Sequence, residues 1–207
     1  PRDILDIIQS KELEKFCKSR EIKTRGNDIE NILDAYKDSE NLYLENYVNI
    51  GFRDLNTLKE NGIVIKEAML GVKFEDLTKS IFTQLGFNVD EKLKKELNTK
   101  KDKIDILLNL GNNELILIEC KTIKESGYNK FSSVSRQMKS YTGLAKAKDC
   151  KIIKSLLIAP DFSDDFINDT ELEYDLNLSL ITASSLLKIL EGFKNSKKHK
   201  QFPYKLL

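Results

Sequence analysis

The sequence predicts an α/β fold, in which a mixed β-sheet is flanked by helices and preceded by a small helical subdomain. Two apolar runs, residues 104–110 and 114–121, flank a Gly-Asn-Asn turn, which is the pattern of a β-hairpin. After this hairpin, helical and strand patterns alternate, as is typical of helices that cover a sheet with parallel strands. Upstream, the apolar residues recur at helical spacing. We therefore expect a helical region over residues 1–66 and an α/β domain over residues 67–207.

The composition excludes some classes of protein. The chain has 207 residues, with 34 Lys and Arg side chains against 33 Asp and Glu. This balance excludes a uniformly basic nucleic-acid-binding surface but leaves room for local basic patches. No apolar run approaches the roughly 20 residues that span a bilayer, and the N-terminus has no signal-peptide pattern, so we expect a cytoplasmic protein without a membrane partner. Because the first residue is Pro1 and not Met, we also expect a longer parent chain.

Cysteine and histidine chemistry is poorly supported. Cys17, Cys120 and Cys150 are odd in number and far apart, so they predict neither a disulfide framework nor a zinc site. His199, the single histidine of the sequence, lies in a lysine-rich tail, where it is badly placed to activate a nucleophile. Any catalysis must therefore depend on carboxylates and lysines.

Residues 10–37 predict two short helices joined by an extended segment, with a break and a new N-cap at residues 26–28. The apolar positions on the facing sides are Leu13, Phe16, Cys17, Ile29, Ile32, Leu33 and Tyr36. This pattern resembles the SAP motif, a small DNA-binding module, and residues 11–25 hold six Lys and Arg against three acids. The resemblance implies DNA contacts by Lys23 and Arg25. The alternative is a packed helical subdomain with a solvated basic face.

The other elements follow in order along the chain. Two short helices near residues 43–50 and 54–58 form a connector to which we assign no function. A helix over residues 68–85 carries an apolar stripe, a short strand follows at 87–89, and residues 92–103 form a charged segment with six lysines and two acids. Beyond the hairpin we expect helices over residues 131–147, 163–175 and 182–193, and strands over residues 152–159 and 178–181.

The strongest chemical signal is Asp105 together with the triplet Glu119-Cys120-Lys121. The hairpin turn lies between the two acids, so the paired strands can bring them side by side. Side chains alternate along a strand, so Glu119 and Lys121 share one face and Cys120 points to the other. Two carboxylates and an ammonium group would then meet at one end of the sheet. An exposed cross-strand ion pair would also explain the triplet.

A pair of carboxylates suits a hard divalent cation. Carboxylate oxygens prefer Mg²⁺ or Mn²⁺, so we expect Mg²⁺ as the cofactor, with Mn²⁺ as a substitute. A cation held there would polarise a phosphodiester and lower the pKa of a bound water molecule. Lys121 could orient the attacking water and neutralise the developing charge.

Ile104-Asp105 and Glu119-Cys120-Lys121 resemble the signature of the PD-(D/E)XK nuclease superfamily, the fold of many restriction endonucleases. Ile104 stands where that signature usually has proline. The resemblance implies that Asp105, Glu119 and the backbone carbonyl of Cys120 bind metal, and that Lys121 assists the attacking water. It also implies a restriction-endonuclease-like mixed sheet flanked by helices.

Two further features strengthen the resemblance, which covers residues 68–193: one is typical of the superfamily, and the other resembles RecB-like and type IIS cleavage domains. Glu75 lies on the helix before the sheet, where the superfamily often has a metal-linked glutamate, and it is a better candidate than the neighbouring Asp76. Gln137 and Tyr141 are four positions apart on the helix after the hairpin, and they resemble an accessory catalytic motif.

The resemblance implies a metal-dependent endonuclease that hydrolyses DNA, as the cleavage domain of a restriction or other defence nuclease. Its expected partners are double-stranded DNA, contacted also by Lys100, Lys101 and Lys103, a second copy for duplex cleavage, and a recognition domain elsewhere in the longer chain. One alternative is a nucleic-acid-binding module with an inactive nuclease-like core. Another is a different activity of the superfamily, such as junction resolution, exonuclease trimming or RNA cleavage.

Overall fold

The computed structural model describes residues 2–196 and 200–207, and all their side chains except those of residues 2, 3, 34 and 37–39. His199 lies outside the described residues. The chain forms two compact units, Pro1–Asn46 and Tyr47–Leu207. Each unit is described by itself.

The first unit consists of helices α1 (Arg2–Leu5), α2 (Ser10–Ser19) and α3 (Asp28–Glu45). Leu13, Cys17 and Ile32 form its small core. The Asn27 side chain caps α3 by accepting hydrogen bonds from the backbone N–H groups of the second and third residues after it, at 2.9 and 3.3 Å. The predicted arrangement of two helices around an extended segment is confirmed, but α3 runs well past residue 37, because no Gly or Pro interrupts it.

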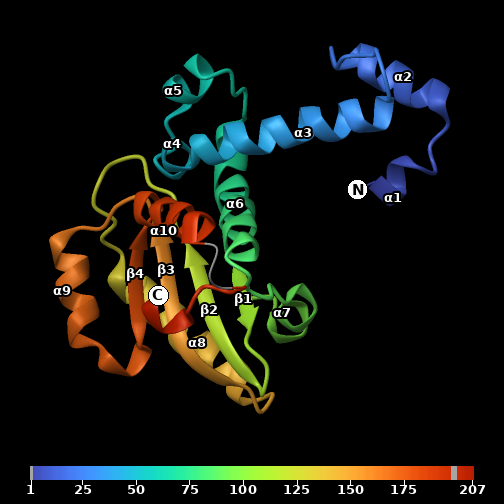
Figure 1. Ribbon diagram of the computed structural model, residues 1–207. Helices are drawn as coiled ribbons and strands as arrows, with labels where there is room; N and C mark the ends of the chain where they lie inside the picture. Colours follow the sequence, from blue (N-terminus) through green and yellow to red (C-terminus); the bar gives the residue numbers. More distant parts are fainter. Residues whose placement is uncertain (1, 197–199) are drawn as a thin grey trace. The chain divides into compact units, whose positions relative to one another are not determined.

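The second unit is built on one four-stranded sheet, with the strands in the order β1-β2-β3-β4 (Figure 1). The strands are β1 (Ile106–Asn109), β2 (Glu114–Cys120), β3 (Lys151–Ala159) and β4 (Leu178–Thr182). β1 and β2 are antiparallel, while β2, β3 and β4 run parallel to one another. The predicted hairpin, the mixed sheet and the later strands are therefore confirmed.

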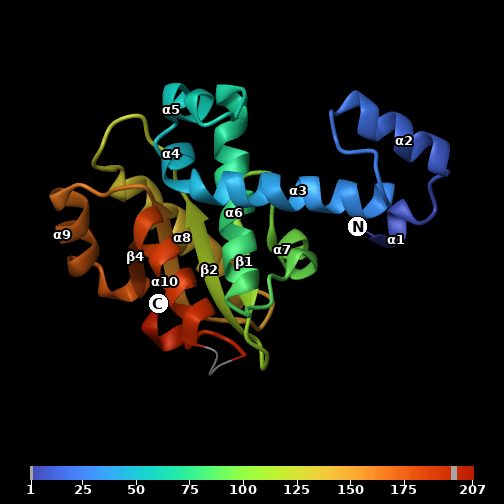
Figure 2. The ribbon, with the colours of Figure 1, turned by 45° about the horizontal axis from the view of Figure 1, so that its top comes forward.

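Helices cover both faces of this sheet (Figures 1 and 2). Helices α8 (Phe131–Lys146) and α9 (Asp164–Leu172) pack on one face, together with Leu115 and Leu117 of β2. Helix α6 (Leu70–Gln84) packs against β2 from the other face, and α10 (Ala183–Ser196) packs against β4 and α6. Because side chains alternate along β2, Glu119 shares the α8 face and Cys120 the α6 face. The short helices η2 (Tyr174–Leu176) and η3 (Tyr204–Leu206) complete the unit.

The boundary between the two compact units lies after residue 46 of the sequence, and not after residue 66 as the sequence suggested. Helices α4 (Tyr47–Gly51) and α5 (Leu55–Glu60) and the turn η1 (Glu67–Met69) belong to the sheet unit. Tyr47 is fully buried, its ring stacks on Phe74 with centroids 4.6 Å apart, and its hydroxyl lies 2.5 Å from the Thr78 hydroxyl. These contacts with α6 join residues 47–66 to the α/β core.

Part of the predicted lysine-rich segment is helical. Helix α7 (Glu91–Leu97) begins after Asp90, whose carboxylate accepts the backbone N–H of Leu93 at 2.9 Å. Leu93 and Leu97 turn toward the hydrophobic core. The expected strand at residues 87–89 is a single bridge from Val89 to Leu108.

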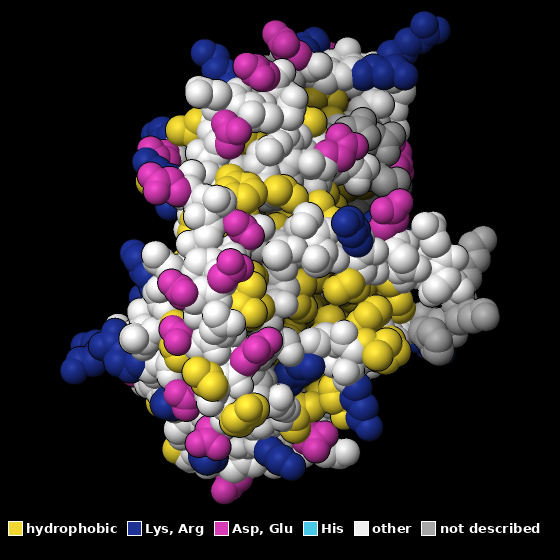
Figure 3. Space-filling view, turned by 90° about the vertical axis from the view of Figure 1, so that its left-hand side faces the viewer, with side chains coloured by type: hydrophobic (Ala, Val, Ile, Leu, Met, Phe, Trp, Pro, Cys, Tyr) yellow, Lys and Arg dark blue, Asp and Glu magenta, His cyan; other side chains and the backbone are white. Residues whose placement is uncertain are grey.

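The side of the second unit that carries α9 bears charged side chains of both signs. Figure 3 looks onto that side, where Asp and Glu side chains are spread over the surface among Lys and Arg side chains. Asp164 and Asp165 lie in the first turn of α9, where they complement the helix dipole. Within residues 2–196 and 200–207, no helix is both long and apolar enough to cross a membrane.

Candidate active site

Asp105 and Glu119 lie side by side at one end of the β1–β2 hairpin. The strand register pairs Ile106 with Ile118, so the next positions outward are Asp105 and Glu119. The backbone N–H of Cys120 donates a hydrogen bond of 2.8 Å to Oδ2 of Asp105. The structure thus brings together the two acids that the hairpin pattern predicted to meet.

Lys121 completes this group from the same face as Glu119. Its ammonium group forms an ion pair with Oε1 of Glu119, which is 2% exposed. Burial alone would lower the pKa of Lys121, but the adjacent Glu119 carboxylate outweighs it, so that pKa is raised. Lys121 therefore carries a positive charge at neutral pH.

Tyr141 of α8 fixes the opposite side of Glu119. Its hydroxyl donates to the backbone carbonyl of Lys103 at 2.7 Å and lies 3.3 Å from Oε2 of Glu119. One aromatic side chain therefore connects α8 to Glu119 and to the segment before β1. Burial, and then the negative charge of Glu119, raise the pKa of Tyr141, so it is a neutral hydrogen-bond donor.

The two acids hold their protons more tightly than isolated carboxyl groups. Burial, followed by the negative charge of Glu119, raises the pKa of Asp105 to about 7. Burial also raises the pKa of Glu119, although Lys121 opposes this change. The carboxylates of Asp105 and Glu119 repel each other when both are ionised, and a nearby cation would relieve this repulsion.

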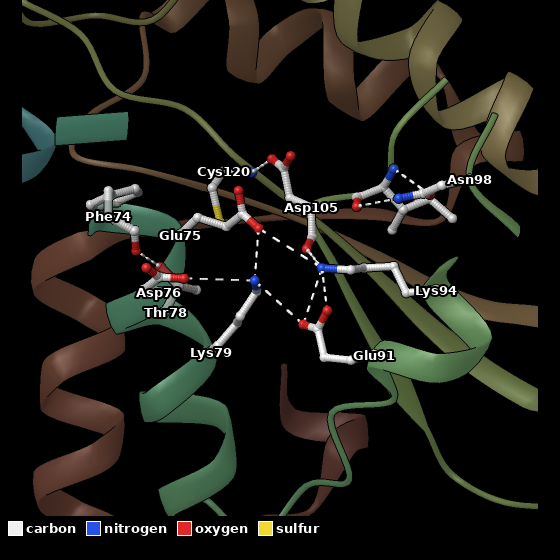
Figure 4. Close-up of polar contacts among 11 residues, drawn as sticks. Phe74, Glu75, Asp76, Thr78, Lys79, Glu91, Lys94, Asn98, Asp105 and Cys120 are labelled. Carbon is white, nitrogen blue, oxygen red and sulfur yellow. Dashed lines mark hydrogen bonds and ion pairs between the residues drawn. The ribbon is translucent and has the colours of Figure 1, made fainter. Parts of the chain in front are cut away.

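Glu75 of α6 lies near Asp105 (Figure 4). Its negative charge contributes to the raised pKa of Asp105 and of Glu119. Its carboxylate is paired with Lys79 at 2.9 Å and is only 26% exposed, whereas the neighbouring Asp76 is 58% exposed. The structure therefore places Glu75, and not Asp76, toward the two hairpin acids.

The chemistry of these donors fits a hard divalent cation. Asp105, Glu119 and Glu75 offer carboxylate oxygens only, which suit Mg²⁺ or Mn²⁺ better than zinc. In the part of the chain that the structure describes, no three His, Cys, Asp or Glu side chains already form a metal-binding group. Each carboxylate is instead turned to a protein partner: a backbone N–H for Asp105, Lys121 for Glu119 and Lys79 for Glu75. Burial is the first cause of the raised pKa of both hairpin acids, and the negative charge of neighbouring carboxylates adds to it.

Cys120 is a partly buried thiol on the α6 face of the sheet. Burial raises its pKa well above the usual value, so it remains a neutral thiol and a poor nucleophile. The sequence predicted a role only for its backbone carbonyl. Cys120 is the last residue of β2, between Glu119 and Lys121, and its backbone N–H donates to Asp105.

The remaining predicted residues lie at different distances from this centre. Gln137 is one helical turn before Tyr141 on α8, and its Oε1 is buried without a hydrogen-bond partner among the described residues. Lys103 is exposed, and its backbone carbonyl accepts a hydrogen bond from the Tyr141 hydroxyl, which also contacts Glu119. Lys100 and Lys101 extend from the exposed loop after α7. The last two candidates, Lys23 and Arg25, are exposed in the separate N-terminal unit.

Sequence reasoning missed one buried lysine beside the site. Lys94 of α7 is 8% exposed, and its ammonium donates to the backbone carbonyl of Asp105 at 2.9 Å. A signal for it was present, because the N-cap Asp90 and the spacing of Leu93 and Leu97 indicate a helix with Lys94 near its inner side. The high charge of residues 92–103 concealed that helix.

Comparisons with known proteins agree with this geometry. A family model described as FokI, cleavage domain, matches residues 23–206. The matched range contains the whole sheet and all the residues of the candidate site, and it begins within the N-terminal helical unit. No curated protein and no solved structure matches the chain significantly.

Proposed function

This chain belongs to the family of the FokI cleavage domain, a DNA endonuclease domain of restriction enzymes, and from that premise we propose that it cuts double-stranded DNA with Mg²⁺ as its cofactor. Metal dependence is general in the family, and Mg²⁺ is the hard cation that oxygen ligands favour, with Mn²⁺ as a substitute. The observation that carries the proposal is the pair Asp105 and Glu119, two neighbouring carboxyl groups with raised pKa values beside the Lys121 ammonium.

In this proposal Asp105, Glu119, Glu75 and the backbone carbonyl of Cys120 hold the cation. When bound, the cation would polarise the scissile phosphate and lower the pKa of a water molecule. The Lys121 ammonium orients the attacking water and stabilises the negative charge that develops on the phosphate. Its ion pair with Glu119 keeps it charged and close to the carboxylates.

Two side chains of α8 support these groups. Tyr141 positions Glu119 through its hydroxyl, which also anchors the backbone of Lys103. Gln137 offers a buried amide oxygen that lacks a partner among the described residues, and this oxygen can accept a hydrogen bond from water or from the substrate. We therefore assign both residues accessory roles in cleavage.

The exposed lysines near the site would bind the DNA backbone. Lys103 stands directly beside Tyr141, and Lys100 and Lys101 lie on the same exposed loop. Lys23 and Arg25 would add phosphate contacts from the N-terminal unit. Contacts of this kind supply affinity without sequence preference, so recognition of a DNA sequence falls to a separate domain.

Duplex cleavage requires two cuts, and one active centre hydrolyses one strand. We therefore propose that two copies act together on one duplex. The three cysteines, Cys17, Cys120 and Cys150, are free thiols, as expected of a protein that works in the reducing cytoplasm, where its DNA substrate also lies.

The test is cleavage of supercoiled plasmid by the purified chain in Mg²⁺ or in EDTA. We expect nicking or linearisation in Mg²⁺ and no cleavage in EDTA. Replacement of Lys121 by Met keeps the length of the side chain but removes its charge, and we expect it to lower the cleavage rate by at least about 100-fold.

Lys151→Met provides the matched control. Lys151 is an exposed lysine at the start of β3, paired with Glu114 at the opposite end of the sheet from the site. We expect this variant to cut at the wild-type rate. Wild-type cleavage in EDTA, or a folded Lys121→Met variant that cuts as fast as Lys151→Met, would overturn the proposal.

A further inference from the structure

Lys94 is a buried lysine to which the proposed chemistry gives no role. Its side chain is 10% exposed, and its ammonium has three acceptors: one on its own helix α7, one in the segment before β1 and one on α6. The distances are 2.8 Å to Oε2 of Glu91, 2.9 Å to the backbone carbonyl of Asp105 and 4.0 Å to Oε1 of Glu75. Withdrawing an ammonium from water is unfavourable, so these contacts must offset a large desolvation penalty.

The contact between Lys94 and Asp105 supplies a hydrogen bond at the edge of the hairpin that faces away from β2. In a strand, the carbonyls of residues i and i+2 point to the same side, so those of Asp105 and Leu107 both face away from β2. The Leu107 carbonyl accepts the backbone N–H of Asp90 at 2.9 Å, and the Asp105 carbonyl accepts the Lys94 ammonium. The segment around α7 thus takes the place of a further strand, and at Asp105 a side chain supplies the hydrogen bond.

Lys94 also closes a ring of alternating charges (Figure 4). Glu75 pairs with Lys79 at 2.9 Å, Lys79 lies 3.4 Å from Glu91, and Glu91 pairs with Lys94. The ring closes where Lys94 returns to Glu75. Because Glu75 lies between two ammonium groups, its carboxylate is held on the side of α6 that faces Asp105.

We propose that Lys94 is a positioning residue of the active site, which fixes the main chain of Asp105 and holds Glu75 beside it, and thereby sets the affinity of these carboxylates for a divalent cation. The inference depends on the proposed metal-binding role of Asp105 and Glu75. It assigns Lys94 no contact with the DNA or with the reacting atoms.

The direction of the change in cation affinity distinguishes a positioning role of Lys94 from a purely electrostatic one. Removing a positive charge near a cation site strengthens cation binding when charge alone matters, because like charges repel. Removing a positioning residue weakens binding, because the ligands lose their arrangement. Substitution of residues that orient metal ligands typically lowers metal affinity about 10- to 100-fold.

The experiment measures Mn²⁺ binding to the full chain without DNA, by the loss of the free Mn²⁺ signal in electron paramagnetic resonance. We expect Lys94→Met to weaken Mn²⁺ binding about 10- to 100-fold. Lys94→Arg retains the charge and the donors, so we expect it to recover most of the affinity. Lys95→Met, the same change at the next residue of α7, is the matched control, because Lys95 is exposed and we expect wild-type binding.

Circular dichroism establishes that each variant is folded. If Lys94→Met does not fold, Glu91→Gln carries the test, because it leaves the ammonium in place but removes its shortest ion pair, and we expect weaker Mn²⁺ binding. A folded Lys94→Met variant, or in its place Glu91→Gln, that binds Mn²⁺ as tightly as wild type or more tightly would overturn the inference. Failure of the proposed metal site looks different: the wild-type chain itself would not bind Mn²⁺, or Asp105→Asn would bind it equally well.

Discussion

Asp105 shows how an active-site residue can work against stability. Its carboxyl group lies beside Glu119 and near Glu75, and its pKa is raised to about 7 from an ordinary value of 3.8. Between these two values the folded chain binds a proton on Asp105 that the unfolded chain has released. The free energy of unfolding therefore falls as the pH rises through this range, because the unfolded state binds fewer protons.

Asp105→Asn should consequently stabilise the metal-free protein at alkaline pH. The amide carries no charge, so the variant avoids the cost of ionising a buried carboxyl group beside Glu119. We expect its melting temperature in EDTA to exceed that of wild type. The difference between the two melting temperatures should grow from about pH 5 to about pH 8 and then level off.

Asp76→Asn is the control for this measurement, because Asp76 is the exposed acid next to Glu75. Asp105→Asn should raise the melting temperature at alkaline pH by more than Asp76→Asn does. If the difference in melting temperature between Asp105→Asn and wild type stays constant or shrinks as the pH rises, ionisation of Asp105 does not destabilise the fold.

At the scale of elements, the site depends on α8 as much as on the hairpin. Tyr141 is 1% exposed, and its hydroxyl connects α8 to Lys103 and to Glu119. The hairpin supplies Glu119, while the helix that follows β2 holds it through the Tyr141 hydroxyl. In our proposal, this helix therefore serves packing and also positions a metal ligand.

Tyr141→Phe isolates the contribution of that hydroxyl. The ring still fills the core, but the Lys103 carbonyl loses its donor, so we expect a loss of about 1 kcal/mol in the free energy of unfolding. Because Glu119 also loses a positioning contact, we expect plasmid cleavage to slow about 10-fold. Urea titration and the plasmid assay measure the two effects.

Tyr174→Phe makes the same chemical change at a side chain that is 84% exposed, and it should alter neither quantity. A Tyr141→Phe variant with wild-type stability and cleavage would show that the hydroxyl does not hold the site together.

The hairpin acids could be predicted from sequence because a local turn determines their register. Once residues 111–113 form the turn, alternation places Asp105 opposite Glu119 and puts Lys121 on the same face as Glu119. The role of Lys94 could not be predicted in this way. Its contact with Asp105 depends on α7, whose charged residues resemble a solvated loop, and on the folding of that helix against the edge of β1.

At the scale of the whole molecule, the division of the chain was the feature that sequence patterns located least well. Residues 47–66 are helical like those before them, so local spacing groups them with the N-terminal helices. Their placement in the sheet unit results from long-range contacts, such as the Tyr47 ring on Phe74 and the hydrogen bond from the Ile123 N–H to the Gly51 carbonyl at 3.0 Å. Contacts of this kind leave no periodic signature.

This division predicts the outcome of two truncations. A chain of residues 47–207 retains the complete α/β core, so we expect it to fold and to cut plasmid. A chain of residues 67–207 loses Tyr47 from its fully buried position against Phe74, a type of loss that costs about 3–5 kcal/mol. We expect this shorter chain to be much less stable or unfolded, as thermal melts followed by circular dichroism would show. Equal melting temperatures for the two chains would contradict the boundary.

In our proposal Asp105 and Glu119 together bind the catalytic cation. The most direct test is a crystal of the chain grown with Mn²⁺ and measured for anomalous scattering at the manganese edge. We expect a manganese peak within coordination distance of both carboxylates. Manganese bound elsewhere in the molecule, with both of these carboxylates unligated, would contradict it.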